Sequence, residues 1–500
     1  MAHPGRPRDR RLPGGRRRGD GGRGVTGAGE QLRPPAGPRP EVAEPAAWSF
    51  PEPDRFVLAN GLSVQAFDMP GQHVLSVQLG IPAPLAGEPE EVEGVGLIMA
   101  RCLDLGTTRH TADEMAELLA RKGIALHAGV GERGILVEVD TISRELTTAL
   151  DLLVECLTEA SFPEEEVRRE VRHRLADIGQ DRADPSSLAA LRLIGTYFDP
   201  ADRASRPAGG SPETVARITA EDVRAHHART MRPDGAVLAV AGDLTGIALQ
   251  DALEEAFARW PSVPGHRPAP ADPGTRAADA GRIVLVDRPG AVQTELHVGG
   301  PGPDRADPLG WGPYQVLSFA MGGSPQARID SVLREERGYT YGIRAGFRPR
   351  SHGGLFTAIG SVSGDVTVEA LEALLSILDL RGADLTDAEL RHAARYQART
   401  ATARFATCEA VAGEAVSLAL DGLDTDFVTR TVAQVRSLDP EVAREAWDRH
   451  RGEPWTVILV GDARHADGVR ALGRGPVEVV RQPREPSSSP IRAEEAGTPR

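Results

Sequence analysis

The chain repeats one plan of sequence signals twice, and this duplication limits its fold more than any other feature. The first copy opens with FVLANGLSVQAF at 56–67 and closes with GAVLAVAGDLT at 235–245. The second opens with GRIVLVDRPGAVQTELHVGG at 281–300 and closes with WTVILVGDAR at 455–464. The Gly-Asp pairs that begin at 242 and 461 therefore mark equivalent strand ends in two similar halves.

Local signals inside each copy predict strands that alternate with capped helices. Asn60-Gly61 lies between two alternating apolar runs and predicts a hairpin. Capping boxes at 111–114 and 386–389 begin two helices, and a third begins at Pro163 with three glutamates in its first turn. The sequence predicts an α+β fold of two homologous sheet-and-helix halves, each a mostly antiparallel sheet packed with helices.

Composition sets the domain boundaries that we expect. Residues 1–46 are rich in Gly, Pro and Arg and are predicted to be a disordered tail, because they cannot bury enough apolar surface. The N-terminal domain is placed at 47–260, a Pro- and Ala-rich linker at 261–281 and the C-terminal domain at 282–475. Residues 476–500 are predicted to be a second disordered tail.

Charge, hydropathy and cysteine content exclude several classes of function. The formal net charge is −14 although residues 1–40 are strongly basic, so the folded part is acidic and no nucleic-acid partner is expected. No apolar run approaches the roughly 20 residues of a membrane helix, so no membrane partner is expected. Three scattered cysteines indicate neither a disulfide framework nor a thiolate metal site. Because no apolar segment follows the early arginines, we expect a cytoplasmic protein.

Four stretches of the chain carry a family resemblance. They are LANGL at 58–62, GVGLIMARCLDLGTTRHTADEMAELLARKGIALHAGV at 94–130, FPEEEVRREVRHRLADI at 162–178 and MGGSPQARIDSVLREERGYTYGI at 321–343. In this order and spacing they resemble the pitrilysin-like metallopeptidases, family M16, of the insulinase and processing-peptidase type. The resemblance implies two homologous halves and a relationship to zinc-dependent cleavage of peptides.

Active members of the family carry His-x-x-Glu-His on a helix ahead of a Gly-Thr pair, with a later glutamate as third zinc ligand. The two His share a helix face and hold one Zn²⁺, while the first Glu acts as general base on the metal-bound water. Anchored on the Gly-Thr at 106–107, the resemblance places the His ligands at Leu97 and Arg101, the base at Ala100 and the third ligand at Asp177.

These four residues predict a degenerate zinc site. Leucine offers no lone pair to a metal, and a lone carboxylate beside an arginine cannot hold zinc. We expect Leu97 to pack in a buried helix and Arg101 to pair with Asp177, which places a cation near the metal position. The chain is therefore expected to bind no metal and to be inactive alone. A self-sufficient peptidase with an unusual metal site on Asp177 is the alternative.

The second half keeps two residues of the family pattern, Arg334 and Tyr341, with Gly338 making a turn between them. The resemblance implies that this arginine binds a carbonyl of the bound peptide and that the tyrosine hydroxyl donates to the oxyanion of the tetrahedral intermediate. The alternative is a surface arginine paired with Glu335 or Glu336, and a half-buried tyrosine on a strand.

A glycine-rich loop precedes that segment. Gly322, Gly323 and Ser324 match the stretch that comes before the arginine helix in the family. Glycines permit tight turns and close approach of the backbone, and we favour a turn-forming role.

Some bacterial members of the family divide the active site between two chains, and the residues above fit the chain without zinc ligands. We hypothesise that this chain is the noncatalytic subunit of a heterodimeric zinc peptidase. The partner would be an M16 subunit with an intact His-x-x-Glu-His motif and bound zinc, and the substrates would be extended peptides. The alternative is a catalytically dead scaffold or peptide-binding module with the same fold.

Overall fold

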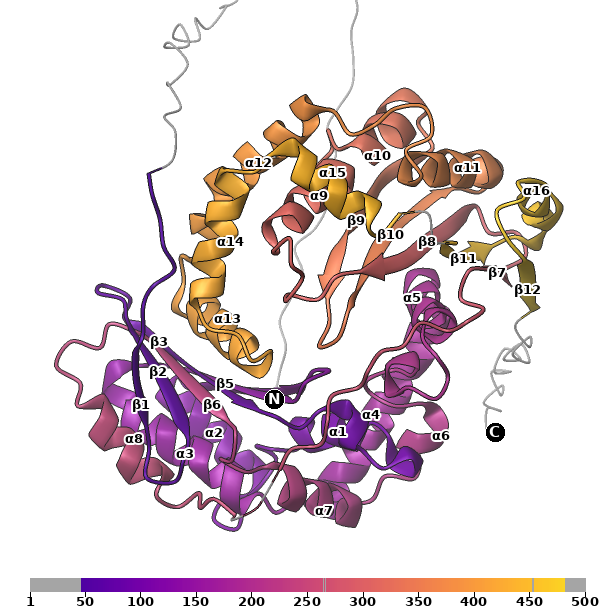
Figure 1. Cartoon of the computed structure of the whole chain (residues 1–500). Coiled ribbons are helices and arrows are strands. Elements are labelled where there is room, and N and C mark those ends of the chain that lie inside the picture. The colour runs from indigo at the N-terminus through magenta and orange to yellow at the C-terminus, as the bar shows by residue number, and fades with distance from the viewer. Residues whose placement is uncertain (1–45, 264, 266, 452–453, 482–500) are drawn as a thin grey trace, which may run out of the picture. The chain divides into compact units, whose positions relative to one another are not determined.

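The structure is a computed structural model that describes residues 46–263, 265, 267–451 and 454–481. Its strands form two sheets of six strands each, with helices packed on both (Figure 1). This architecture confirms the predicted α+β class and the two sheet-and-helix halves. Except for Ala46, the N-terminal tail that we predicted at 1–46 lies outside the described residues.

The first half places its strands in the order β1-β2-β6-β3-β5-β4. All neighbouring pairs are antiparallel except β2 and β6, which run parallel. The strands are β1 (Asp54–Val57), β2 (Ser63–Asp68), β3 (Val74–Ile81), β4 (Ala125–Val130), β5 (Ile135–Ile142) and β6 (Val237–Gly242). The helices are α1 (Val95–Arg101), α2 (Ala112–Lys122), α3 (Leu146–Glu159), α4 (Glu164–Ala183), α5 (Pro185–Tyr197), α6 (Pro212–Val215), α7 (Ala220–Thr230) and α8 (Leu249–Phe257).

The second half places its strands in the order β12-β7-β11-β8-β10-β9. The strands are β7 (Ile283–Asp287), β8 (Gln293–Gly302), β9 (Thr340–Pro349), β10 (Gly354–Ser363), β11 (Thr456–Gly461) and β12 (Val477–Arg481). The helices are α9 (Gly312–Gly322), α10 (Arg328–Asp330), α11 (Thr367–Leu378), α12 (Asp387–Thr400), α13 (Cys408–Leu420), α14 (Asp426–Arg436), α15 (Pro440–Asp448) and α16 (Ala466–Ala471). A π-helical segment, Ser331–Glu336, follows α10.

The two strand orders agree at five of their six positions, which confirms the duplication. Strands β6 and β11 hold the same position, and they end at the predicted Gly242 and Gly461. The boundary that we predicted at 476 is wrong, because Val477–Arg481 form β12 and pair parallel with β7. The valines of this strand pack against the apolar core, which a prediction from polar composition overlooks.

The predicted starts of three helices are confirmed. Thr111 and Glu114 form a reciprocal capping box at α2, and Gly123 ends that helix in the left-handed region at φ 64°. A capping box of the same kind begins α12 at Thr386. Pro163 is the N-cap residue of α4, whose first turn holds three glutamates.

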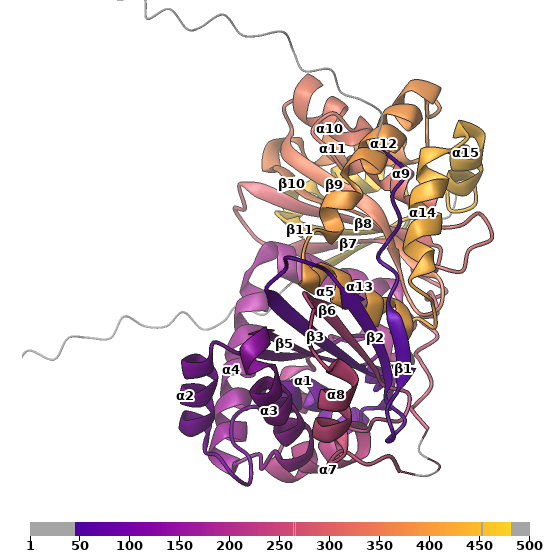
Figure 2. The same cartoon turned by 90° about the vertical axis from the view of Figure 1, so that its left-hand side faces the viewer.

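Each half also covers the sheet of the other half. Helix α13 of the second half packs on β3 and β6, as both views show, and α5 of the first half packs on β8 and β11 (Figures 1 and 2). Glycines make room for both helices. A Cβ on Gly80 of β3 would lie 2.5 Å from Val416 of α13, and one on Gly299 of β8 would lie 2.9 Å from Leu193 of α5.

The predicted linker at 261–281 contains no helix or strand among its described residues. It is nevertheless fixed to the first half. The carboxylate of Asp272, which is only 5% exposed, accepts a hydrogen bond from the backbone N–H of Ala204, and Asp199 donates to the carbonyl of Thr275. The part of the linker around Asp272 and Thr275 therefore packs on the first half, whereas its described residues from 261 to 270 are exposed.

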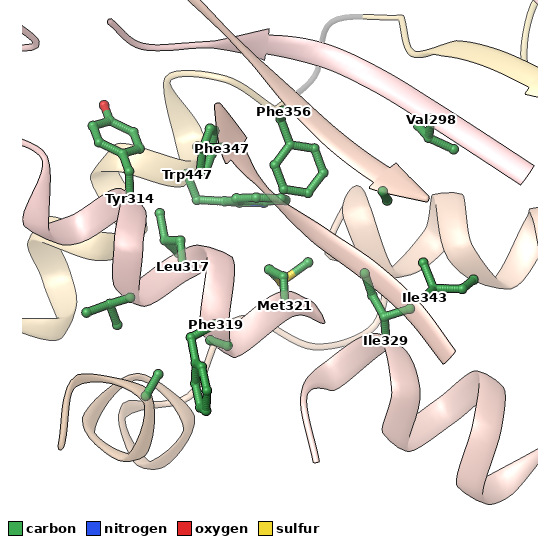
Figure 3. Packing of buried hydrophobic residues seen from close by; sticks show 14 of the residues in the cluster. Val298, Tyr314, Leu317, Phe319, Met321, Ile329, Ile343, Phe347, Phe356 and Trp447 are labelled. Atoms are coloured by element: carbon green, nitrogen blue, oxygen red, sulfur yellow. The ribbon is translucent and has the colours of Figure 1, made fainter. Parts of the chain in front are cut away.

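The larger apolar core lies under the second sheet (Figure 3). Trp447 of α15 packs edge-on against Phe356 of β10, with ring centroids 5.1 Å apart, and Phe347 of β9 lies beside both rings. Aromatic pairs in this geometry contribute about 0.5–1.5 kcal/mol each beyond their buried area. This core holds β9 and β10 rigidly against α9 and α15.

In the described part of the chain, none of the helices combines the length and apolarity required to cross a lipid bilayer. The cytoplasmic location stays a prediction.

One buried histidine gives the fold a predictable response to acid. His297 of β8 is 1% exposed, and neither ring nitrogen has a hydrogen-bond partner among the described residues. Burial lowers the pKa of His297 to about 4, and the nearest carboxylate, that of Glu295, lies 3.9 Å from Nε2. As the pH falls from about 6.5 towards 4, His297 binds a proton in the unfolded chain but stays neutral in the folded chain. The free energy of unfolding therefore decreases.

We expect His297→Gln to remove this part of the acid sensitivity. Gln78 occupies the equivalent position in the first half, so the side chain suits this type of strand. Between pH 7 and pH 5 the variant should lose about 2 kcal/mol less unfolding free energy than the wild type, measured by urea denaturation. His173→Gln, at an exposed histidine, is the control and should behave as the wild type. Equal losses of unfolding free energy in the wild type and in both variants would contradict the assignment of this acid sensitivity to His297.

Candidate functional site

Apolar side chains occupy two of the four positions of the degenerate zinc motif, Leu97 and Ala100. Helix α1 begins after Gly94, which adopts a left-handed conformation at φ 97° and leaves no room for a side chain beside the carbonyl of Gly209. Leu97 packs against the same segment, since a Cβ on Gly209 would lie 2.7 Å from its Cδ2. Ala100 is 3% exposed in the core. Neither position presents a group that binds metal or moves a proton.

The other two positions form the predicted ion pair. Arg101 ends α1, and its Nη2 donates to Oδ2 of Asp177 on α4 at 2.9 Å. The two side chains are 32% and 44% exposed, so the pair contributes only about 0.2–1 kcal/mol to stability. Its main effect is on charge, because a guanidinium lies on the carboxylate that would have to face a metal.

The surroundings do not favour zinc either. Burial, together with the carboxylates of Glu170 and Glu166, raises the pKa of the Cys102 thiol to about 12, so this sulfur stays protonated. Within the described ranges no group of three or more His, Cys, Asp or Glu side chains could hold a metal ion. The residues at this position therefore do not fit a zinc ion.

A buried charge cluster that the sequence analysis missed holds the start of α1. Arg203 is 6% exposed, and its guanidinium lies 3.1 Å from Glu88 and 3.4 Å from Glu93. Arg206 forms a bidentate ion pair with Glu93. The carboxylate of Glu88 also accepts from the backbone N–H groups of residues 94 and 96, and its burial raises the pKa of Glu88. The acidic stretch GEPEEVEG at 87–94 was the available signal.

In the second half, Arg334 and Tyr341 lie as the sequence predicted on either side of a turn. Arg334 belongs to the π-helical segment, a rare geometry that often occurs at functional sites. Its side chain is 38% exposed, with Nη1 3.6 Å from Glu335, as the alternative interpretation anticipated. Gly338 makes the turn at φ 66°, and Tyr341 lies near the start of β9.

Tyr341 is not the half-buried residue of that alternative, because 90% of it is exposed. The pairing of β9 with β10 shifts register between Gly360 and Val362, opposite Tyr341, and such bulges redirect side chains. The hydroxyl makes no hydrogen bond to any described residue. An exposed phenol on a rigid strand is free to meet a group from another molecule.

A buried carboxylate fixes the backbone on which this pair lies. Asp330, the last residue of α10, is fully buried and accepts a hydrogen bond from the backbone N–H of Ile343 at 2.8 Å. Its second oxygen lies 3.2 Å from Arg344. This link joins the helical segment of Arg334 to the strand of Tyr341, so the spacing of the two side chains is set by the fold.

The glycine-rich loop lies so close to neighbouring backbone that two of its positions have no room for a side chain. A Cβ on Gly322 would lie 2.5 Å from the backbone nitrogen of Ala345, and one on Gly323 would lie 2.6 Å from Cα of Phe319. Ser324 follows after the end of the helix and is half-buried. The loop therefore lets α9 end against β9, and this geometry agrees with the turn-forming role that we favoured.

Comparison with known proteins decides the family. Residues 64–198 match the profile described as "Insulinase (Peptidase family M16)", and residues 217–396 match the one described as "Peptidase M16 inactive domain". The chain belongs to peptidase family M16. An uncharacterized zinc protease of Mycobacterium tuberculosis is 25% identical over 354 residues, which cover 70% of this M16 chain and 80% of the relative.

Two solved structures share the M16 fold. A "peptidase M16 inactive domain" from Pseudomonas fluorescens superposes with a TM-score of 0.74 at 21% identity, over 82% of this chain and 98% of that one. A chain of "Complex III2 from Candida albicans" superposes with a TM-score of 0.69 at 15% identity, over 84% and 99% of the two chains. These likenesses concern the fold, and this M16 chain differs from the zinc-binding pattern at Leu97, Ala100 and Arg101.

Proposed function

We propose that this chain is the noncatalytic subunit of a heterodimeric M16 zinc peptidase. In this proposal a partner chain with His-x-x-Glu-His holds the zinc, and this chain closes over it with Arg334 and Tyr341. One observation carries the proposal: Tyr341 is 90% exposed on strand β9, while the chain's own metal position is occupied by Leu97 and an ion pair. This chain keeps the hydroxyl donor and lacks the metal-binding side chains, which is the combination that a divided active site requires in one of its two chains.

The two side chains suit the tasks that we assign to them. Arg334 keeps its charge at any physiological pH and can donate to the carbonyl of an extended peptide. The Tyr341 hydroxyl can donate to the oxygen on which charge develops during peptide cleavage. Buried Asp330 holds the intervening backbone, so little reorganisation is needed when a peptide binds. In this proposal the peptide bond is cleaved only by the complex of the two chains.

The proposal is tested by co-expressing this chain with the most similar chain of the same genome that has an intact His-x-x-Glu-His motif. Peptide cleavage and zinc content are measured for each chain alone and for the purified mixture. We expect cleavage only by the mixture, and zinc only in the partner. Asp177→Asn should leave the zinc content of this chain unchanged, which tests the alternative metal site.

Stoichiometric zinc in this chain alone, with activity that is lost on chelation, would overturn the proposal. A stable mixture whose activity does not depend on this chain would support the alternative function, a scaffold.

A further inference from the structure

A cavity beside the degenerate zinc position is lined by more positive than negative side chains. It has a volume of about 960 Å³, and its lining residues come from α4, α5, the segment that leads into α6, and the end of β7 with the two residues after it. Its charged lining residues are Arg174, Asp181, Arg182, Arg192, Asp287 and Arg288. In a chain of net charge −14, this is a local excess of positive charge that favours an anion.

Two of the four arginines keep their guanidinium groups unpaired among the described residues, although hydrogen bonds and, to a smaller extent, the charge of Arg182 lower the pKa of Glu213. Arg174 and Arg288 each donate a hydrogen bond to a backbone carbonyl of this chain. Arg182 and Arg192 are exposed and make no hydrogen bond or ion pair with any described residue. They come from neighbouring helices, α4 and α5, and both line the cavity.

The acidic lining residues are already engaged. Oδ1 of Asp287 accepts from the backbone N–H of Ala463 at 3.0 Å, and Asp181 lies 3.5 Å from Arg174. The lining between the charges includes the apolar side chains of Ile178, Leu188 and Leu191. An apolar surface with a few positioned charges is the usual composition of a ligand site.

We propose that this cavity binds a carboxylate-bearing segment of a peptide through Arg182 and Arg192. A guanidinium binds a carboxylate with two parallel hydrogen bonds, and the apolar lining suits the aliphatic part of a peptide. Arg174 lies one helical turn before Asp177 on α4, so a peptide held here passes the Arg101–Asp177 pair. The inference rests on the proposed function in one respect, which is that the ligand is a peptide.

The test is isothermal titration calorimetry on the full chain without any partner. The probes are a six-residue peptide with two central glutamates and blocked ends, the same peptide with glutamines, and an alanine peptide with a free C-terminus. We expect a carboxylate-bearing peptide to bind at least about tenfold more tightly than the glutamine peptide, and more weakly as salt is added. The glutamate and free-C-terminus peptides distinguish a side-chain carboxylate from a terminal one.

The double variant Arg182→Gln/Arg192→Gln should lose this preference, whereas Arg168→Gln/Arg172→Gln, at two exposed arginines of the same helix α4, should keep it. Thermal unfolding checks that both variants are folded. Equal affinity for charged and neutral peptides, no measurable binding of any carboxylate peptide, or full binding by the Arg182/Arg192 variant would overturn the inference. Because no partner is present, these results are independent of whether the mixture cleaves peptides.

Discussion

In the heterodimeric complex that we propose, Tyr341→Phe is expected to lower kcat for peptide cleavage about 100-fold. The substitution removes one hydroxyl that is 90% exposed in the free chain, so neither folding nor packing should change. The loss arises only if that hydroxyl donates to charge that develops in the transition state. KM should change little, because the ground-state carbonyl is a weaker acceptor. Initial rates over a range of peptide concentrations measure both constants.

Tyr396→Phe is the matched control, since this tyrosine on α12 is also partly exposed and stacks on Phe319 through its ring alone. It should leave kcat within a factor of about two, as surface substitutions away from a site usually do. Co-purification should show that both variants bind the partner equally well. An unchanged kcat in Tyr341→Phe would remove the oxyanion role and leave this chain as a scaffold within the complex.

Arg203→Met is expected to lower the free energy of unfolding by about 3–5 kcal/mol, because it leaves buried carboxylates without their cation. Glu88 and Glu93 are both almost fully buried beside Arg203. Glu93 keeps Arg206, so the larger cost falls on Glu88, which would then be charged in an apolar setting. Urea denaturation at constant pH measures the loss.

Adding Glu88→Gln to Arg203→Met tests the cause. A neutral amide removes the uncompensated charge, and its single oxygen can still accept from one of the two backbone N–H groups that the carboxylate binds at the start of α1. The double variant should therefore recover part of the lost stability, and the two substitutions should not be additive. A loss below about 1 kcal/mol in Arg203→Met would show that the cluster is as weak as a surface pair.

The sequence predicted correctly those parts of the structure that depend on residues close together in the chain or on a motif with fixed spacing. Capping boxes, the strand-ending glycines and the Arg101–Asp177 pair all follow from residue types at fixed short spacings or from a motif with a known register. The same reasoning placed Arg334 and Tyr341 on a helical segment and a strand. It could not reveal the bulge opposite Tyr341, because a register shift depends on the partner strand β10.

Long-range packing accounts for the remaining differences. Helical periodicity shows that α5 and α13 have apolar faces, but it does not say which sheet those faces meet. Gly80 and Gly299 lie at equivalent places in the two halves, and only the structure shows that each accepts a helix from the other half. The cluster around Arg203 joins residues that are far apart in sequence, and strand β12 was hidden by the polar composition around it.

The exchange of α5 and α13 has a consequence for how the protein is made. When the ribosome has synthesised the first half, all six strands of the first sheet are present, but the helix that covers β3 and β6 is not yet translated. The nascent chain must carry this uncovered face until residues 408–420 emerge. Exposed apolar faces of this kind bind chaperones and aggregate. We therefore expect the first half to be completed late in folding, when α13 docks on β3 and β6, and we expect this face to need protection until then.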